Sequence, residues 1–169
     1  FIAEQAATFT IFYFSILLLN FIASKNDLTL KNNFEILLYS LFLLLIPESL
    51  MSSRVIWANF FILLALRRLI SLRSKKNVKT KLFDAAILIS IASLYYFWSL
   101  LFFGLIPIVL LFYSSSNIKH WLIPFLGLAT VLVLSISVSI ILYNDYWSLL
   151  KTNYYILLVS MEQPTMKIN

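Results

Sequence analysis

Long apolar runs separated by short polar segments make up most of the chain. The clearest runs extend from Ala6 to Ala23 and from Trp121 to Tyr143. Each comes close to the roughly 20 residues that an α-helix needs to cross a hydrocarbon core of about 30 Å. Because a backbone within lipid must satisfy its own hydrogen bonds, we expect both runs to be membrane-spanning helices.

Two shorter apolar runs follow the first one, from Phe34 to Ile46 and from Val55 to Leu66. Alone, each is too short to cross a bilayer. They reach a sufficient length if flanking residues contribute, because the charged ends of Arg54 and Arg67 can extend to the interface. The pattern therefore predicts two short spans joined by a tight turn, and a hairpin lying in the interface is the alternative.

The run from Phe83 to Tyr113 has an ambiguous length. As one helix it would be about 46 Å long at 1.5 Å per residue, which is too long without strong tilt. Two spans would both be short and partly re-entrant. Pro107 lacks a backbone donor and clashes with a preceding carbonyl, and Gly104 lies close to it. We expect a broken element or a short hairpin, with the break near Phe103 and Gly104.

Polar residues inside the runs have simple structural explanations. We expect the hydroxyls of Ser135, Ser137 and Ser139 to donate hydrogen bonds to carbonyls of their own helix. The amides of Asn20 and Asn59 are expected to form hydrogen bonds between helices. The tail after Tyr143 is rich in aromatic residues and predicts either an amphipathic surface helix or the entry to a further span.

Composition agrees with this pattern. Of 169 residues, 62% are hydrophobic and 12% are charged, whereas a soluble domain has roughly a quarter charged residues. The predicted fold is an all-α, polytopic transmembrane helical bundle with about five to six membrane-inserted helices, forming one domain over residues 1–169. The first residue is Phe1, so we expect this domain to belong to a longer chain. Cysteine is absent, and no metal or cofactor is expected.

A basic segment from Arg67 to Lys81 accounts for the excess of positive charge, which is +6 over the whole chain. It contains seven basic residues and no acidic one: Arg67, Arg68, Arg73, Lys75, Lys76, Lys79 and Lys81. At a helix centre each would cost about 2.5–3.5 kcal/mol, so the segment is predicted to be a loop or a helix end at the surface. The positive-inside rule places it in the cytoplasm of a bacterium, beneath the inner membrane. This topogenic role explains the charge without nucleic-acid binding.

This orientation extends to the rest of the chain. Because the two short spans form a pair, the segment with Lys25 and Lys31 is predicted to lie on the same cytoplasmic side as the basic segment. The turn with Glu48 and the end with Phe1 are then outside. The agreement of two basic segments is an internal check on the assignment.

Candidates for chemistry are few. The chain has no phosphate-binding glycine loop, metalloprotease motif or nucleophile elbow. Glu48 is a weak catalytic candidate, with a solvated turn residue or a partner of Arg54 as the simpler explanation. His120 is expected at a membrane interface, and Asp84 is expected to cap a helix. The cluster from Tyr95 to Trp98 lines a lipid or polyprenyl groove or belongs to an interfacial aromatic belt.

Two stretches carry a resemblance to known families: LLLNFIASKNDLTLKNN and RRLISLRSKKNVKTKLFDAAILISIASLYYFWSLLF. They resemble an uncharacterised family of inner-membrane proteins from Bacteroidota, which implies no particular activity. The order of short paired helices, basic segment and broken helix is more weakly similar to the GT-C superfamily. That likeness implies a glycosyltransferase using a polyprenyl-phosphate sugar. Where such enzymes have glycine-rich elements, this chain reads ISIASLYYFW.

Two functional hypotheses follow. The first is a non-catalytic subunit of a larger cell-envelope or secretion assembly, with the lipid bilayer and membrane proteins as its partners. The alternative is a GT-C-like transferase that binds a polyprenyl lipid. A transporter is disfavoured because no carboxylate lies in the middle of an apolar run.

Overall fold

Helices form every regular element of the computed structural model, which describes residues 2–26, 34–45, 52–113 and 119–143. The α-helices are α1 (Ile2–Lys25), α2 (Phe34–Leu45), α4 (Ser53–Ile70), α5 (Val78–Tyr95), α6 (Leu105–Tyr113) and α7 (Lys119–Tyr143). Two 3-10 helices, η1 (Ser71–Ser74) and η2 (Phe97–Gly104), connect some of them. Within these ranges there is no strand, so the predicted all-α class is confirmed.

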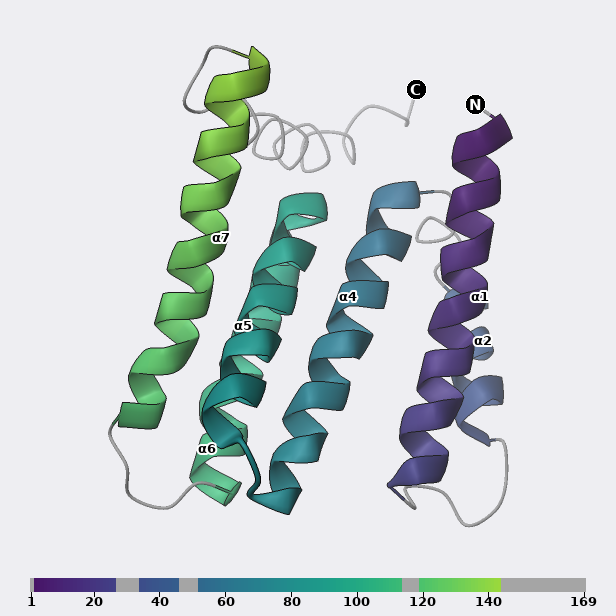
Figure 1. Ribbon diagram of the computed structural model, residues 1–169. Coiled ribbons are helices and arrows are strands. Elements are labelled where there is room, and N and C mark those ends of the chain that lie inside the picture. The colour runs from purple at the N-terminus through teal and green to yellow at the C-terminus, as the bar shows by residue number, and fades with distance from the viewer. Residues whose placement is uncertain (1, 27–33, 46–51, 114–118, 144–169) are drawn as a thin grey trace, which may run out of the picture.

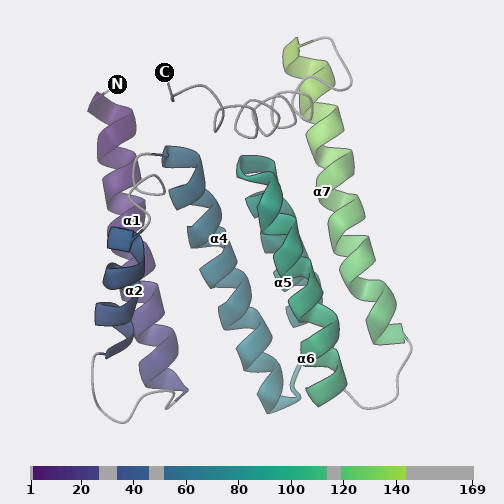
Figure 2. The ribbon, with the colours of Figure 1, turned by 180° about the vertical axis from the view of Figure 1, so that it is seen from behind.

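Four of the helices lie side by side in one row, in the order α1, α4, α5, α7 (Figure 1). The remaining helical segments pack on one face of that row. Seen from behind, α2 lies over α1, and η2 with α6 lies over α5 (Figure 2). The molecule therefore has one complete layer and a second, incomplete layer.

Three of the described helices are long and apolar enough to cross a membrane: Glu4–Lys25, Ser53–Ser74 and His120–Ile141. A shorter apolar segment, Phe97–Phe112, accompanies them. These helices support the predicted membrane-spanning bundle, and the expected total of five to six inserted helices stays a prediction. The tail after Tyr143 lies outside the described residues.

The run from Phe83 to Tyr113 forms a hairpin, as one of the two expectations had it. Its break lies at Tyr96, and the predicted position near Phe103 and Gly104 was wrong. Tyr96 is extended, with φ −144° and ψ 109°, and the chain then returns along α5. At Gly104 the 3-10 helix simply becomes α6. Pro107 is tolerated there because the first backbone N–H groups of a helix have no partner within it.

The core fills the space where α4, α5 and α6 meet. Its buried members come from all three helices and η1: Ala65, Leu69, Leu72, Leu82, Ala85, Ala86, Ile89, Ile106 and Leu110. Ile106 and Leu110 are at most 2% exposed, so the returning arm of the hairpin packs firmly against α5. The α5–α6 pair is thus one packed unit.

Small residues bring α7 close to α5. The buried side of α7 carries Gly127, Val131, Ser135 and Ser139 at four-residue spacing. A methyl group on Gly127 would lie 2.7 Å from the Cβ of Ala86. Such small residues allow close backbone approach, which is how helices pack where lipid supplies no hydrophobic drive.

The polar residues behave partly as expected. The hydroxyls of Ser135 and Ser137 donate to carbonyls of α7 at 2.9 and 2.8 Å. Asn59 Nδ2 donates to the hydroxyl of Tyr39 at 2.5 Å and joins α4 to α2, as predicted. Asn20 differs, because its Oδ1 accepts a hydrogen bond within α1, from the hydroxyl of Ser24 at 3.2 Å.

Candidate functional site

The basic segment is almost entirely helical. Arg67 and Arg68 continue α4, Arg73 lies in η1, and Lys79 and Lys81 lie in the first turn of α5. The two helices are joined by residues 75–77, where Lys75 and Asn77 both adopt left-handed backbone with φ of 52°. The segment is therefore a pair of helix ends around a tight turn, which brings its positive charges close together.

Asp84 does not cap the helix, so that expectation was wrong. The α5 helix begins at Val78, before Asp84, and Asn77 occupies the N-cap position. Asp84 Oδ2 instead lies 3.4 Å from Nε of Arg68. The carboxylate thus offsets one positive charge of the basic segment across the α4–α5 pair.

Lys81 is also engaged within the basic segment. Its Nζ donates to the carbonyl oxygen of Ser71 at 2.6 Å and to the hydroxyl of Ser74 at 2.8 Å. An ammonium has three donors and suits an array of oxygen acceptors. Lys81 therefore fastens η1 to the start of α5 and fixes the turn.

The end of α1 meets the basic segment through one aromatic ring. The guanidinium carbon of Arg67 lies 4.9 Å from the centre of the Phe21 ring, and Nζ of Lys25 lies 5.4 Å from it. These distances are those of cation–π contacts. Lys25 and the basic segment thus share one end of the bundle, as predicted, and which side of a membrane that end faces stays a prediction.

A half-open groove lies beside Arg73, between α1, α4 and α6. Its volume is about 250 Å³. Five of its lining residues are aliphatic: Leu66, Leu69, Ile70, Leu105 and Val109. Asn26 and Arg73 add polar groups. The groove therefore combines an apolar wall with a cation, at the end of the bundle that carries the basic segment.

Among the described residues, the ion pair of Arg68 with Asp84 is the one salt bridge. Arg73 thus has no acidic partner in that part of the chain. The same part contains no group of three or more histidine, cysteine, aspartate or glutamate residues that would hold a metal ion. The chemistry that this site offers is recognition of an anionic group attached to an apolar one.

One member of the predicted aromatic cluster, Tyr95, packs against α4. Tyr95 stacks on Trp57 and Phe61, with a ring-centre separation of 5.8 Å in each case. Sequence reasoning missed both partners, although an aromatic pair four residues apart on one helix was a visible signal. This stack lies at the opposite end of the row from the basic segment (Figure 1).

Of the remaining candidate residues, the structure describes His120. His120 is the second residue of α7, at the same end as the basic segment (Figure 1). Glu48 and Lys31 lie outside the described residues.

Comparison of the chain with protein-family models, with curated proteins and with solved structures gives no match.

Proposed function

We propose that the chain is a multi-spanning protein of the bacterial inner membrane that acts as a non-catalytic subunit of a cell-envelope or secretion assembly. In this proposal α1 packs against a transmembrane helix of a partner protein. The basic segment faces the cytoplasm. The composition of the outer face of α1 supports this function best.

The α1 helix is an edge helix with little cover. Only 17% of the residues in its apolar stretch are buried, against 39% in the stretch that contains α4. Thr8, Ser15 and Ile22 are buried at seven-residue spacing, a helical period that gives α1 one packed side. This side faces the neighbours of α1, which are α4 and α2.

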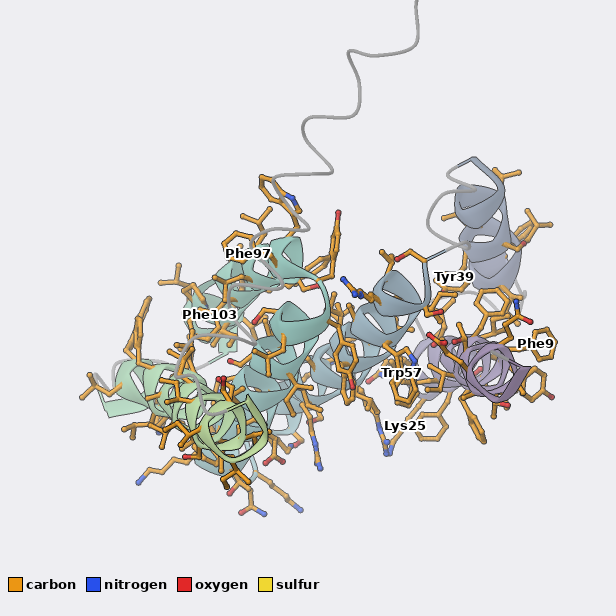
Figure 3. All side chains as sticks on the ribbon, turned by 90° about the horizontal axis from the view of Figure 1, so that it is seen from above. Phe9, Lys25, Tyr39, Trp57, Phe97 and Phe103 are labelled. Carbon is orange, nitrogen blue, oxygen red and sulfur yellow. The ribbon has the colours of Figure 1, made fainter. Side chains whose placement is uncertain are left out.

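The opposite side forms an aromatic edge, consisting of Phe9, Tyr13, Phe14 and Leu17. Their exposed fractions lie between 44% and 71%. Phe9 lies at the outer end of the row, beyond α1 (Figure 3). In lipid-facing helices, Tyr and Trp gather near the interfaces, whereas aliphatic residues dominate the middle.

The hydroxyl of Tyr13 carries the proposal. Tyr13 lies near the midpoint of α1, is 55% exposed and has no hydrogen-bond partner among the described residues. A hydroxyl facing hydrocarbon without a partner costs roughly 1–3 kcal/mol on the scale of protein mutations. A partner helix that offers an acceptor removes this cost, because polar side chains join membrane helices by hydrogen bonds.

The distribution of charge supports the orientation. The described basic residues gather at one end of the row, with Arg54 at the start of α4 as the exception (Figure 1). An excess of Lys and Arg in short connections is the main determinant of cytoplasmic sidedness. The end of the bundle with the basic segment is therefore expected in the cytoplasm, and the partner helix is expected alongside α1 within the same bilayer.

Site-specific photocrosslinking in cells tests this function. A photoreactive residue at Phe9 is expected to yield a crosslink to a discrete membrane protein, and the crosslinked peptide should come from one of its transmembrane helices. The same residue at Val133, on the exposed side of α7, is the matched control and is expected to react with lipid. Lipid adducts alone at both positions, together with a monodisperse monomer in mild detergent, would refute the proposal.

A GT-C-like transferase is the second candidate, and the stack of Trp57, Phe61 and Tyr95 favours it. Aromatic faces suit contact with isoprenoid chains, and the stack lies away from the basic segment. Glu48 would be its acidic residue, four residues before Ser52, the N-cap of α4. If Glu48→Gln leaves the envelope glycans of the cell unchanged, this assignment of Glu48 is lost.

A further inference from the structure

We infer that the groove between α1, α4 and α6 binds one anionic phospholipid of the bilayer. The phosphate lies at Arg73 and Asn26, and the first part of an acyl chain lies between α4 and α6. This inference does not depend on the proposed partner of α1. It rests on the shape of the groove, on its charge and on its position along the helices.

The shape suits part of a lipid. The volume of about 250 Å³ falls just below the roughly 300–1,000 Å³ of pockets that enclose a whole small molecule. The wall is aliphatic on both flanks, with Leu66 and Ile70 from α4 and Val109 from α6. The groove therefore accommodates one flexible chain segment and leaves the remainder of the lipid in the bilayer.

The position of the groove also agrees with a lipid. Its α4 side begins at Leu66 and continues to Ile70, beside η1 with Arg73. Past Leu66 and Leu105 the space narrows to a crevice beside Ile62 and Phe102 that has no room for an acyl chain. From Ile70 back to Leu66 a helix rises about 6 Å at 1.5 Å per residue. That length is less than half of one leaflet, which is half of a core of about 30 Å, so the groove takes only the first carbons of a chain below its phosphate.

The positive charge at the groove comes from Arg73. The nearby Arg68 and Arg67 interact with other groups. Arg68 pairs with Asp84, and Arg67 lies against the ring of Phe21. Arg73 is exposed, and its guanidinium can hold two phosphate oxygens in a fork. Asn26 donates one amide hydrogen to the carbonyl of Ile22 at 2.8 Å and has a second one to offer.

A free anion would contact only the polar part of this groove. Inorganic phosphate could meet Arg73, but it would leave the aliphatic wall without a ligand. An acyl chain covers that wall, and a phosphate attached to it meets the cation at the level of the headgroups. Basic pockets between membrane helices recognise anionic lipids in this way.

Thermal unfolding of the whole protein in vesicles tests the inference. The parent protein is expected to be stabilised by phosphatidylglycerol added to phosphatidylcholine vesicles, and to retain phosphatidylglycerol in native mass spectrometry. Arg73→Ala should weaken this retention roughly tenfold, which corresponds to about 1.4 kcal/mol. Arg73→Lys should weaken the retention less, because lysine keeps the positive charge and loses only the paired hydrogen bonds of the guanidinium.

Three controls make the result decisive. Lys76→Ala removes an exposed charge from the same turn, and Arg54→Ala removes one from the opposite end; both should retain the lipid. Val109→Trp fills the groove and leaves its charge unchanged, and it should lose the lipid as Arg73→Ala does. Each variant must melt like the parent in phosphatidylcholine alone, and Val109→Phe replaces Val109→Trp if the larger ring prevents folding.

Several outcomes would overturn the inference. Equal effects of Lys76→Ala and Arg73→Ala would mean that binding reflects the general positive field. If phosphatidylglycerol gave no stabilisation beyond that of the phosphatidylcholine vesicles, the net negative charge of the lipid would have no role. Stabilisation by inorganic phosphate in phosphatidylcholine vesicles, as strong as that by phosphatidylglycerol, would mean an anion site without a chain. Full retention in the groove-filled variant would place the lipid elsewhere.

Discussion

The two edge helices of the row, α1 and α7, expose different kinds of apolar surface. Both are long enough to span a membrane. The outer side of α7 is largely aliphatic in its middle, with Leu126, Leu132, Val133 and Leu134 among its exposed residues. The outer side of α1 instead carries the aromatic edge, with the hydroxyl of Tyr13 near mid-length.

The packed sides of the two helices differ as well. Gly127 allows α7 to approach α5 until a methyl group would no longer fit. On α1 the most buried residue is Ser15, which is 0% exposed and donates its hydroxyl to the carbonyl of Ile11 at 2.9 Å. The apolar stretch of α1 is 17% buried and that of α7 is 28% buried, so α1 has less of its surface covered. In the proposed function, a partner helix covers the outer side of α1.

Gly127→Leu is expected to have the largest effect. The new side chain would meet Ala86 and the carbonyl oxygen of Phe83, both already close to the position of a Cβ. Overpacking of this kind typically costs 1–3 kcal/mol, and here backbone is involved. Gly104→Leu is the control, because nothing lies within 4 Å of a Cβ there. Equal melting temperatures for the two variants in detergent would contradict a close α5–α7 contact.

Ser15→Leu should have a smaller effect, on α1 alone. A bulkier side chain at this buried position would push α1 away from its neighbours, at a cost of about 1–2 kcal/mol. Limited proteolysis near the start of α4 should become faster, while the core of α4, α5 and α6 retains its hydrogen-exchange protection. Leu17→Ile, on the outer side of α1, should leave both measurements unchanged. Uniform loss of protection would show that α1 is not an independent edge.

Tyr13→Phe is expected to affect assembly and leave the isolated protein unchanged. Loss of one interhelical hydrogen bond in a membrane costs about 0.6 kcal/mol on average and up to about 1.7 kcal/mol. Crosslinking from Phe9 should therefore fall a few-fold, with no change in the melting temperature of the purified chain. A matched ring on the other edge, Leu126→Phe, should change neither quantity.

The ion pair of Arg68 with Asp84 should have the smallest effect. The two side chains are 52% and 31% exposed, and exposed pairs contribute about 0–1 kcal/mol, less at high salt. Asp84→Asn is thus expected to shift the melting temperature slightly at low salt and not at high salt. A large loss at both salt concentrations would assign Asp84 a role beyond this contact.

Hydropathy predicted the helices well because lipid demands continuous apolar length. The runs at Ala6 and Trp121 became α1 and α7, and the hydroxyls of Ser135 and Ser137 found carbonyls as expected. The reversal at Tyr96 escaped prediction because no glycine or proline marks it, and because the aromatic contacts that flank it come from α4. Local residue preferences contain no information about such distant partners.

The groove was beyond sequence reasoning for the same reason. Asn26 follows the end of α1, whereas Arg73 lies in η1 and Val109 in α6. Nothing in their spacing indicates that they share a wall. The basic segment was recognised as a topological signal, whereas the difference between Arg68, which is paired, and Arg73, which has no acidic partner in the described residues, depends on packing. Asp84 was misassigned because the start of α5 came earlier than its apolar pattern suggested.

The hairpin of α5 and α6 has a consequence for the order of membrane insertion. Lys79, Lys81 and Asp84 make α5 a poor substrate for insertion by itself, whereas η2 and α6 carry no charge. In the predicted arrangement with α5 and α6 inserted, the apolar arm carries the charged one into the bilayer as a single unit, because the two arms pack together. The hairpin returns the chain to the end from which it departed, so α7 starts there and finishes at the end where α1 begins (Figure 1).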